Sequence, residues 1–313
     1  MRWRWLLAIP GLLLSSVLLL SACSTQIAGL VLKDQVQPVT VSAQQIQLMT
    51  ADRQSYALDQ LDSAVSNALA LQPQAENLTV FIHGMGPYPD KAYKHQEMTA
   101  LSEAYSSAVI MLNWPAWEDR SVLPRQNALA SGRLLSPLWQ QLKIARQQPA
   151  LADKKLILVA HSMGAEVLRG ISESAQPAGA VFDNLLLAAP ETDLKDHAAW
   201  LNRVKLSTEK LVLVNRDDNM LPFARSVMKK PRLGLTLRHD DGDGEPMAQD
   251  TRYLVLEDVT EWHSVYASRQ SDEVNALLRG LVLSGEVPAV CATGAAGQRL
   301  VYSPEGCRGM ERS

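Results

Sequence analysis

Along most of the chain, short apolar runs alternate with longer segments in which apolar residues recur every three or four positions. The short runs have the length and the nearly continuous apolar character of strands buried on both faces, and the longer segments have the period of amphipathic helices. The predicted strands are Leu78–Ile82, Ala108–Leu112, Leu156–Ala160, Leu185–Ala188, Leu211–Val214 and Tyr253–Leu256. The predicted helices around them are 91–105, 124–147, 165–174, 195–204 and 272–283.

This alternation predicts an α/β domain built on a doubly wound, mostly parallel sheet with helices on both faces. Upstream, Gln45–Thr50 is predicted to be a strand and Leu58–Leu71 an amphipathic helix, so we expect the domain to cover residues 45–286. Residues 287–313 are predicted to form a C-terminal tail. Because sites in such sheets lie at the carboxyl ends of the strands, the polar residues that follow each apolar run are the candidates for chemistry.

The first residues have the layout of an export signal. Arg2 and Arg4 precede the apolar stretch Leu6–Leu20, which is short for a membrane span and ends in small residues. The pattern therefore predicts a signal peptide that is removed, and the alternative is an uncleaved N-terminal anchor.

The end of this segment, Leu20-Ser21-Ala22-Cys23, resembles the lipoprotein box of bacteria, in which the cysteine receives the lipid. The resemblance implies a signal peptide over residues 1–22, lipidation of Cys23 and a lipidated tether over residues 23–44. It also implies, from Ser24, sorting to the outer membrane, so we expect a chain anchored at its periplasmic face. Two or three acyl chains make such an anchor stable where one would be marginal.

Composition and charge narrow the class of protein. The 313 residues are 47% hydrophobic and carry a formal net charge of −3, which fits a globular domain and gives no reason to expect a nucleic-acid partner. Besides Cys23, the chain has Cys291 and Cys307 near its C-terminus. In an oxidising compartment these two are expected to form a disulfide, and two free thiols are the alternative.

The strand predicted over Leu156–Ala160 leads into His161-Ser162-Met163-Gly164. This is a nucleophile elbow, in which a serine at a sharp strand-to-helix turn lifts its hydroxyl above the sheet. The residues two before and two after the serine must be small, and Ala160 and Gly164 meet that requirement. Ser162 is therefore the predicted nucleophile, and the alternative is a serine that only caps the helix.

A serine hydroxyl needs a base, because it is a weak nucleophile by itself. Of the six histidines, only His263 lies in the loop after the last predicted strand, where this fold places its base. His161 adjoins Ser162, and neighbouring side chains on an elbow point apart. A surface or capping role for His263 is the alternative.

The acid is expected after a strand between the serine and the histidine, giving the chain order Ser, Asp, His. The segment after Leu211–Val214 supplies Asp217 and Asp218, and adjacent carboxylates cannot both point at one ring. Asp258 is a third and weaker candidate.

An oxyanion hole needs two backbone N–H groups aimed at the charge that develops on the substrate. The residue after the nucleophile, Met163, is expected to supply one. The other is expected from the loop after Leu78–Ile82, where His83-Gly84-Met85-Gly86 points to Met85.

These motifs together resemble a bacterial family of α/β hydrolases catalogued as a domain of unknown function. The resemblance runs from about Leu78 to Ser268 and implies hydrolysis without naming a substrate. In the family the presumed acid precedes x-Ala-Leu, which corresponds to Asp218 and favours it over Asp217; Met220 replaces that alanine here. The motifs that carry the resemblance are His83-Gly84, Asn113-Trp114-Pro115, Ala160 to Gly164, Ala188-Ala189-Pro190, Asp218 to Leu221 and His263-Ser264.

The sequence therefore predicts a serine hydrolase of the α/β-hydrolase fold in the cell envelope, which cleaves a carboxylic ester of a small molecule or lipid. No metal or cofactor is expected. Thioesterase, amidase and acyltransferase activities stay open, because short motifs do not describe the acyl pocket. The alternative from another class is a non-catalytic lipoprotein that uses the hydrolase fold as an interaction module.

Two weaker features have more than one interpretation. The acidic segment Asp240–Glu245 lacks the full ligand spacing of a calcium loop, so a solvated loop is the favoured interpretation. Trp114, Trp117 and Trp139 are predicted either to line an apolar acyl pocket or to pack in the core.

Overall fold

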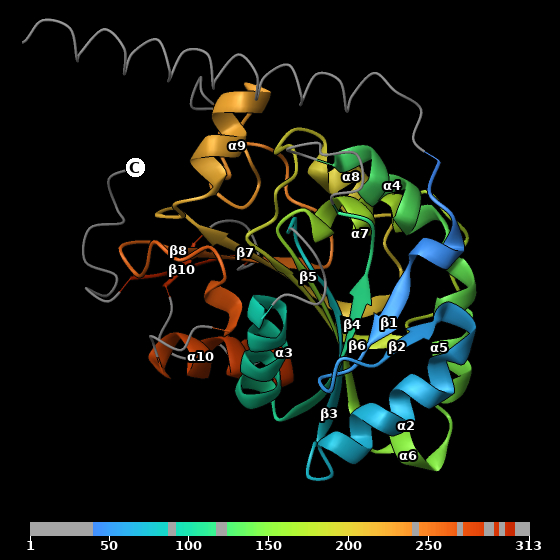
Figure 1. The fold of residues 1–313 in the computed structure, drawn as a ribbon. Coiled ribbons are helices and arrows are strands. Elements are labelled where there is room, and N and C mark those ends of the chain that lie inside the picture. Colours follow the sequence, from blue (N-terminus) through green and yellow to red (C-terminus); the bar gives the residue numbers. More distant parts are fainter. Residues whose placement is uncertain are drawn as a thin grey trace, which may run out of the picture.

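The computed structural model describes residues 40–86, 92–116, 124–239, 244–267, 272–284, 291–293 and 298–303. These residues form a ten-stranded sheet in the order β2-β1-β4-β3-β5-β6-β7-β8-β10-β9, with helices on both faces (Figure 1). The strands are β1 Gln47–Met49, β2 Ser55–Ala57, β3 Asn77–Ile82, β4 Ser107–Asn113, β5 Lys155–His161, β6 Phe182–Ala188, β7 Ser207–Asn215, β8 Thr251–Leu256, β9 Cys291–Thr293 and β10 Arg299–Tyr302.

The seven neighbouring strands β4, β3, β5, β6, β7, β8 and β10 pair in parallel. The antiparallel pairs lie at the two edges of the sheet, where β1 pairs with β2 and β4, and β9 pairs with β10. The helices are α2 Leu61–Leu71, α3 Ala92–Tyr105, α4 Arg125–Arg133, α5 Ser136–Ala145, α6 Pro149–Ala152, α7 Gly164–Ser172, α8 His197–Leu201, α9 Leu221–Met228 and α10 Asp272–Arg279. Short 3-10 turns lie at Ala43–Gln45, Leu58–Gln60 and Val265–Ala267, and a π turn at Gly280–Ser284 follows α10.

Alternate residues of the central strands face two separate cores, as expected for a sheet covered on both sides. Leu78, Val80 and Ile82 of β3 pack in the core that lies under α2, α4, α5 and α7. Phe81 packs in the opposite core, under α3 and α10. The predicted doubly wound sheet and its six central strands are confirmed.

The segment 124–147 was predicted as one helix, and that prediction is wrong. The chain forms α4, turns at Leu134 and Leu135, and restarts as α5 with Pro137 in its first turn. Proline has no N–H to donate to the preceding turn, so it favours the start of a helix over its interior. The apolar periodicity carries on across the break because both helices cover the same core.

The prediction that Tyr253–Leu256 is the last strand is also wrong. Strand β10 pairs in parallel with β8, so the domain extends beyond residue 286 into the segment predicted to be a tail. Leu300 and Val301 of β10 are buried in the two cores. A run of this length has no periodicity of its own, and only its pairing with β8 identifies it as a strand.

Several predictions fall on residues outside those described. The signal segment, Cys23 and most of the tether are among them, so the lipid anchor stays a prediction. Cys307 and the side chain of Cys291 also lie outside, and the disulfide stays a prediction. Among the helices of the described residues, none has the length and apolar character needed to span a membrane.

Candidate active site

Ser162 lies at the sharp turn between β5 and α7. Its φ of 53° is in the left-handed region, which is strained for a residue with a side chain. The neighbouring backbone holds it there: its N–H donates to the carbonyl of Ala188 at 3.0 Å, and its own carbonyl accepts from the N–H of Glu191 at 3.0 Å. A Cβ on Gly164 would lie 2.5 Å from the carbonyl oxygen of Ile82, so the small residue predicted after the serine is required by the packing of α7 on β3.

Asp218 and His263 meet at the carboxyl ends of β7 and β8. Nδ1 of His263 lies 2.6 Å from Oδ2 of Asp218, whose side chain is buried. The other carboxylate oxygen of Asp218 accepts the N–H groups of Met220 and Leu221 at 2.8 and 2.9 Å. These two bonds fix the carboxylate at the start of α9 and leave Oδ2 for the imidazole.

The two other acidic candidates contact each other instead. Oδ2 of Asp217 accepts the N–H of Asp258 at 2.7 Å, and Asp258 adopts a left-handed φ of 55°. Asp217 therefore supports the turn after β8, and the described contacts place only Asp218 against His263.

The loop that carries His263 is fastened to the end of β7. The side-chain amide of Asn215 donates to the carbonyls of Thr260 and Trp262 at 3.0 and 3.1 Å. The ring of His263 packs against that of His161, with 4.7 Å between centroids. Burial, and then repulsion from the imidazole of His263, hold the pKa of His161 well below its ordinary value. His161 is therefore an uncharged side chain that packs against His263.

The loop after β3 lies directly against the nucleophile. A Cβ on Gly84 would be 2.8 Å from Cβ of Ser162 and 3.3 Å from its Oγ, so only glycine allows this approach. His83 anchors the loop: its ring stacks on Trp114, whose Nε1 donates to the His83 carbonyl at 2.8 Å. Among the backbone hydrogen bonds of the described residues outside helices and strands, none is donated by the N–H of Met85 or Met163, the two predicted oxyanion donors.

The structure decides two of the three tryptophan predictions. Trp114 and Trp139 are almost fully buried in the core, and Trp139 meets Phe182 edge-on at 5.8 Å, so neither lines an acyl pocket. Trp117 and residues 240–243 lie outside the described residues. Within the described ranges there is no group of three His, Cys, Asp or Glu residues that could hold a metal ion.

A cluster of buried charges next to the elbow, where the N–H of Glu191 donates to the carbonyl of Ser162, was not predicted from the sequence. Arg232 donates to Glu191 at 3.1 Å and also to Asp193, while Arg125 donates to Glu166 at 2.5 Å. Glu191 is the first polar residue after β6, three positions beyond Ala188, so the search for polar residues after each apolar run could have found it. Burial raises the pKa of Glu191 to about 7, although Arg125 and Arg232 oppose the shift.

Glu191 is expected to make the stability of the fold depend on pH. Between pH 4.5 and 7 the folded chain keeps a proton that the unfolded chain loses. The contribution of this group to the free energy of unfolding therefore falls as the pH rises through this window, by at most about 1.4 kcal/mol per pH unit. The variant Glu191→Gln should remove that fall, as measured by urea unfolding at pH 5, 6, 7 and 8.

Histidines with lowered pKa values, such as His161 and His197, act in the opposite direction, so the difference between variant and wild type isolates Glu191. Glu209→Gln, at an exposed position of β7, is the control and should keep the wild-type pH dependence. An unchanged pH dependence in Glu191→Gln would contradict the expectation.

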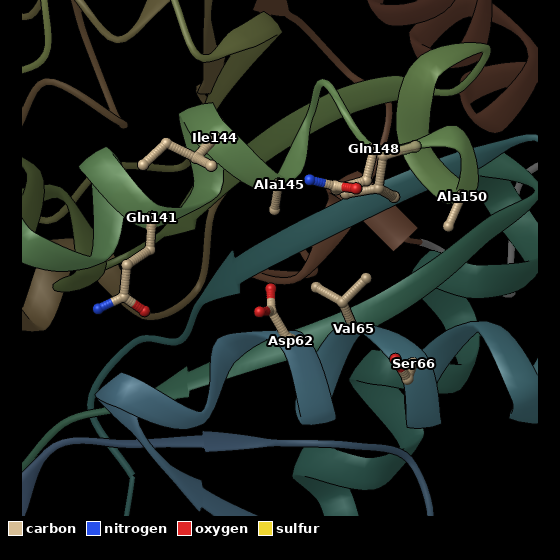
Figure 2. A pocket seen from close by; sticks show the side chains of 9 residues that line it. Asp62, Val65, Ser66, Gln141, Ile144, Ala145, Gln148 and Ala150 are labelled. Carbon is tan, nitrogen blue, oxygen red and sulfur yellow. The ribbon is translucent and has the colours of Figure 1, made fainter.

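Two hollows lie on the surface away from the Asp218–His263 pair. A groove of about 380 Å³ runs between α2 and α5, with Val65, Ala145 and Ile144 on its walls (Figure 2). A cleft of about 500 Å³ has Trp200 and Lys230 on its lining. Neither contains a predicted site residue.

The chain matches a family model described as an alpha/beta hydrolase of unknown function (DUF900) over residues 59–264, which include Ser162, Asp218 and His263. No curated protein matches the sequence.

The chain is also similar to solved structures at low identity. Carboxyl esterase 2 from the fungus Tuber melanosporum is 13% identical, with a TM-score of 0.36, covering 66% of this chain and 76% of that one. A dienelactone hydrolase from Anabaena variabilis is 13% identical, with a TM-score of 0.34 and coverages of 66% and 83%. A hyperthermophilic esterase from Pyrobaculum calidifontis is 10% identical, with a TM-score of 0.29 and coverages of 74% and 68%. These likenesses are too distant to carry an argument about the substrate.

Proposed function

The chain belongs to this family of α/β hydrolases of unknown function, and on that premise we propose that it is a serine hydrolase that cleaves carboxylic esters. The observation that carries the proposal is the 2.6 Å contact between His263 and Asp218 at the same edge of the sheet as the strained Ser162. A histidine held by a buried carboxylate beside a serine at an elbow is the arrangement that activates a hydroxyl group.

In the proposed reaction, the hydroxyl oxygen of Ser162 attacks the ester carbonyl, and Nε2 of His263 takes the hydroxyl proton. Nδ1 of His263 donates to Asp218, which fixes the tautomer and stabilises the imidazolium. The N–H groups of Met163 and Met85 bind the oxyanion. His263 then gives its proton to the leaving alcohol oxygen, and an acyl group remains on Ser162.

In the second half of the reaction, His263 takes a proton from water as the water attacks the acyl-enzyme. Collapse of the second tetrahedral intermediate releases the carboxylic acid and returns the proton to Ser162. Each step uses only side chains and backbone groups of this chain together with substrate and water.

A fluorophosphonate probe tests the proposal, because it reacts with a serine whose hydroxyl is activated by a base. We expect the full chain to be labelled at Ser162 and nowhere else, as located by mass spectrometry of the labelled peptide. Ser172→Ala, a change in α7 at a hydroxyl that donates only to the carbonyl of Arg169, should be labelled like the wild type. Absence of labelling in folded wild-type protein would favour the non-catalytic interaction module instead.

The place of the reaction is proposed from the sequence alone. The box that ends in Cys23 supports a lipid anchor, and Ser24 supports the periplasmic face of the outer membrane. An enzyme held there would meet small esters that enter the envelope and lipid esters of the membrane itself.

A further inference from the structure

Large apolar side chains next to the Asp218–His263 pair are exposed to solvent. Within the described residues, five large hydrophobic side chains are clearly exposed, and three of them are Met220, Phe223 and Trp262, at 51%, 42% and 56%. We call these three the apolar rim. An exposed apolar patch that adjoins a site indicates that the patch receives a ligand or partner.

Backbone hydrogen bonds bring the members of the rim together. The N–H of Asn219 donates to the carbonyl of Glu261 at 3.0 Å, which lays the segment before Met220 beside the segment before Trp262. The N–H of Met220 is bound to Asp218, and Trp262 directly precedes His263. Phe223 lies one turn further along α9, and its N–H donates to the Met220 carbonyl at 3.2 Å.

The side chains of the rim do not hold α9 on the domain. Leu221 and Ala224 form the buried side of this helix, which stands beyond the carboxyl ends of β7 and β8 (Figure 1). Met220 and Phe223 stay exposed at the edge of the site. The rim therefore has free apolar surface where a substrate would arrive.

The chemistry of the proposed reaction decides which part of an ester meets this surface. His263 must deliver its proton to the oxygen of the leaving alcohol, so the alcohol part lies on the side of His263. The oxyanion loop with Gly84 and Met85 follows a different strand, β3. The rim adjoins His263 and Asp218, which puts it on the alcohol side.

We propose that Met220, Phe223 and Trp262 bind the apolar alcohol portion of the substrate, so that the enzyme prefers esters of uncharged alcohols with alkyl or aryl chains. This inference rests on the proposed function, because it assigns the specificity of the same site. It separates the two halves of the ester: the rim selects the leaving group and not the acyl group.

The test uses two series of esters and one set of variants. Acetates of ethyl, butyl, hexyl and octyl alcohol vary the alcohol, and p-nitrophenyl esters from acetate to octanoate vary the acyl chain. The parameter is kcat/KM, which reports on acylation, the step in which the alcohol leaves. In the triple variant M220S/F223S/W262S, the ratio of octyl to ethyl acetate should fall about 10-fold, because the apolar contact with the longer alcohol is lost.

Matched controls come from the two other exposed hydrophobic residues. Ile144→Ser, at the groove between α2 and α5 (Figure 2), and Leu71→Ser, at the end of α2, should keep the wild-type ratio of octyl to ethyl acetate. Conservative changes at the rim, Phe223→Leu and Trp262→Phe, should retain most of the wild-type preference for octyl over ethyl acetate. If the triple variant does not fold, the single variants Phe223→Ser and Trp262→Ser give the same comparison with smaller decreases.

Several outcomes would overturn the inference. A fall in the p-nitrophenyl octanoate to acetate ratio would assign the rim to the acyl chain instead. No change in either ratio, or a loss of binding to phospholipid vesicles with both ratios kept, would show that the rim does not select the alcohol. These results differ from a failure of the proposed function, in which wild-type protein neither hydrolyses any ester nor reacts with the fluorophosphonate.

Discussion

Replacing Ser162 by alanine is expected to lower kcat/KM on an activated aryl ester by roughly a thousandfold or more, because no nucleophile remains for the acyl-enzyme. The fold should persist, since the change removes one hydroxyl and the backbone bonds of residue 162 to Ala188 and Glu191 stay in place. Alanine would have the same left-handed φ as the serine, so the strain at the elbow is also retained. The measurement is kcat/KM on p-nitrophenyl acetate, with circular dichroism to check folding.

The variant His263→Ala should lose about as much activity as Ser162→Ala, and the double variant S162A/H263A should lose little more. The two side chains act as a unit, so once one of them is removed, removing the other lowers kcat/KM very little further. Ser172→Ala, in the same helix as the elbow, is the matched control and should keep wild-type turnover. Wild-type turnover in Ser162→Ala would rule out the proposed mechanism.

Asp218→Asn is expected to lower kcat/KM by roughly a thousandfold, because an amide facing Nδ1 of His263 favours the tautomer that cannot take the proton of Ser162. Most of the structure at this position should be kept. The amide oxygen of asparagine can still accept the N–H groups of Met220 and Leu221, which start α9. The loss should therefore appear in turnover and not in the thermal midpoint.

Asp217→Asn is the control for this prediction, since it makes the same chemical change one residue earlier. Asp217 accepts the N–H of Asp258 and does not contact His263, and an amide oxygen can replace its carboxylate in that bond. We expect a change in kcat/KM of less than about tenfold. An inactive Asp217→Asn together with an active Asp218→Asn would leave the serine mechanism standing and reverse the choice of acid.

The parts of the fold that the sequence predicts well are those whose cause is local. Each central strand is a short apolar run, and burial on both faces requires that pattern wherever the strand lies in the sheet. The elbow is also recognisable locally, because its strand, serine and helix start form one short stretch of sequence. The packing that requires a small residue at Gly164 is not local, since a Cβ there would meet Ile82 and His83, about 80 positions earlier. The pattern fails where an element lacks a local signal, as at β10, which exists as a strand only through β8.

The candidate site was predictable to the level of residue type and chain order, and the remaining choices needed contacts between distant segments. The residues alone left Asp217 and Asp218 open, and the resemblance to the family favoured Asp218. The structure pairs Asp218 with His263, 45 positions away, and engages Asp217 with Asp258, 41 positions away. Neither partner can be inferred from the local sequence, because it depends on how the ends of β7 and β8 meet.

The sequence by itself thus determined the doubly wound sheet, the serine at its elbow and the strands after which Asp218 and His263 lie. The tertiary structure alone decided which carboxylate faces the imidazole, that Trp114 and Trp139 are core residues, and that Arg232 pairs with Glu191 next to the elbow. The physical reason is range. Apolar periodicity and turn sterics act between near neighbours, whereas a buried charge or a hydrogen bond takes its partner from whatever segment the packing brings within about 3 Å.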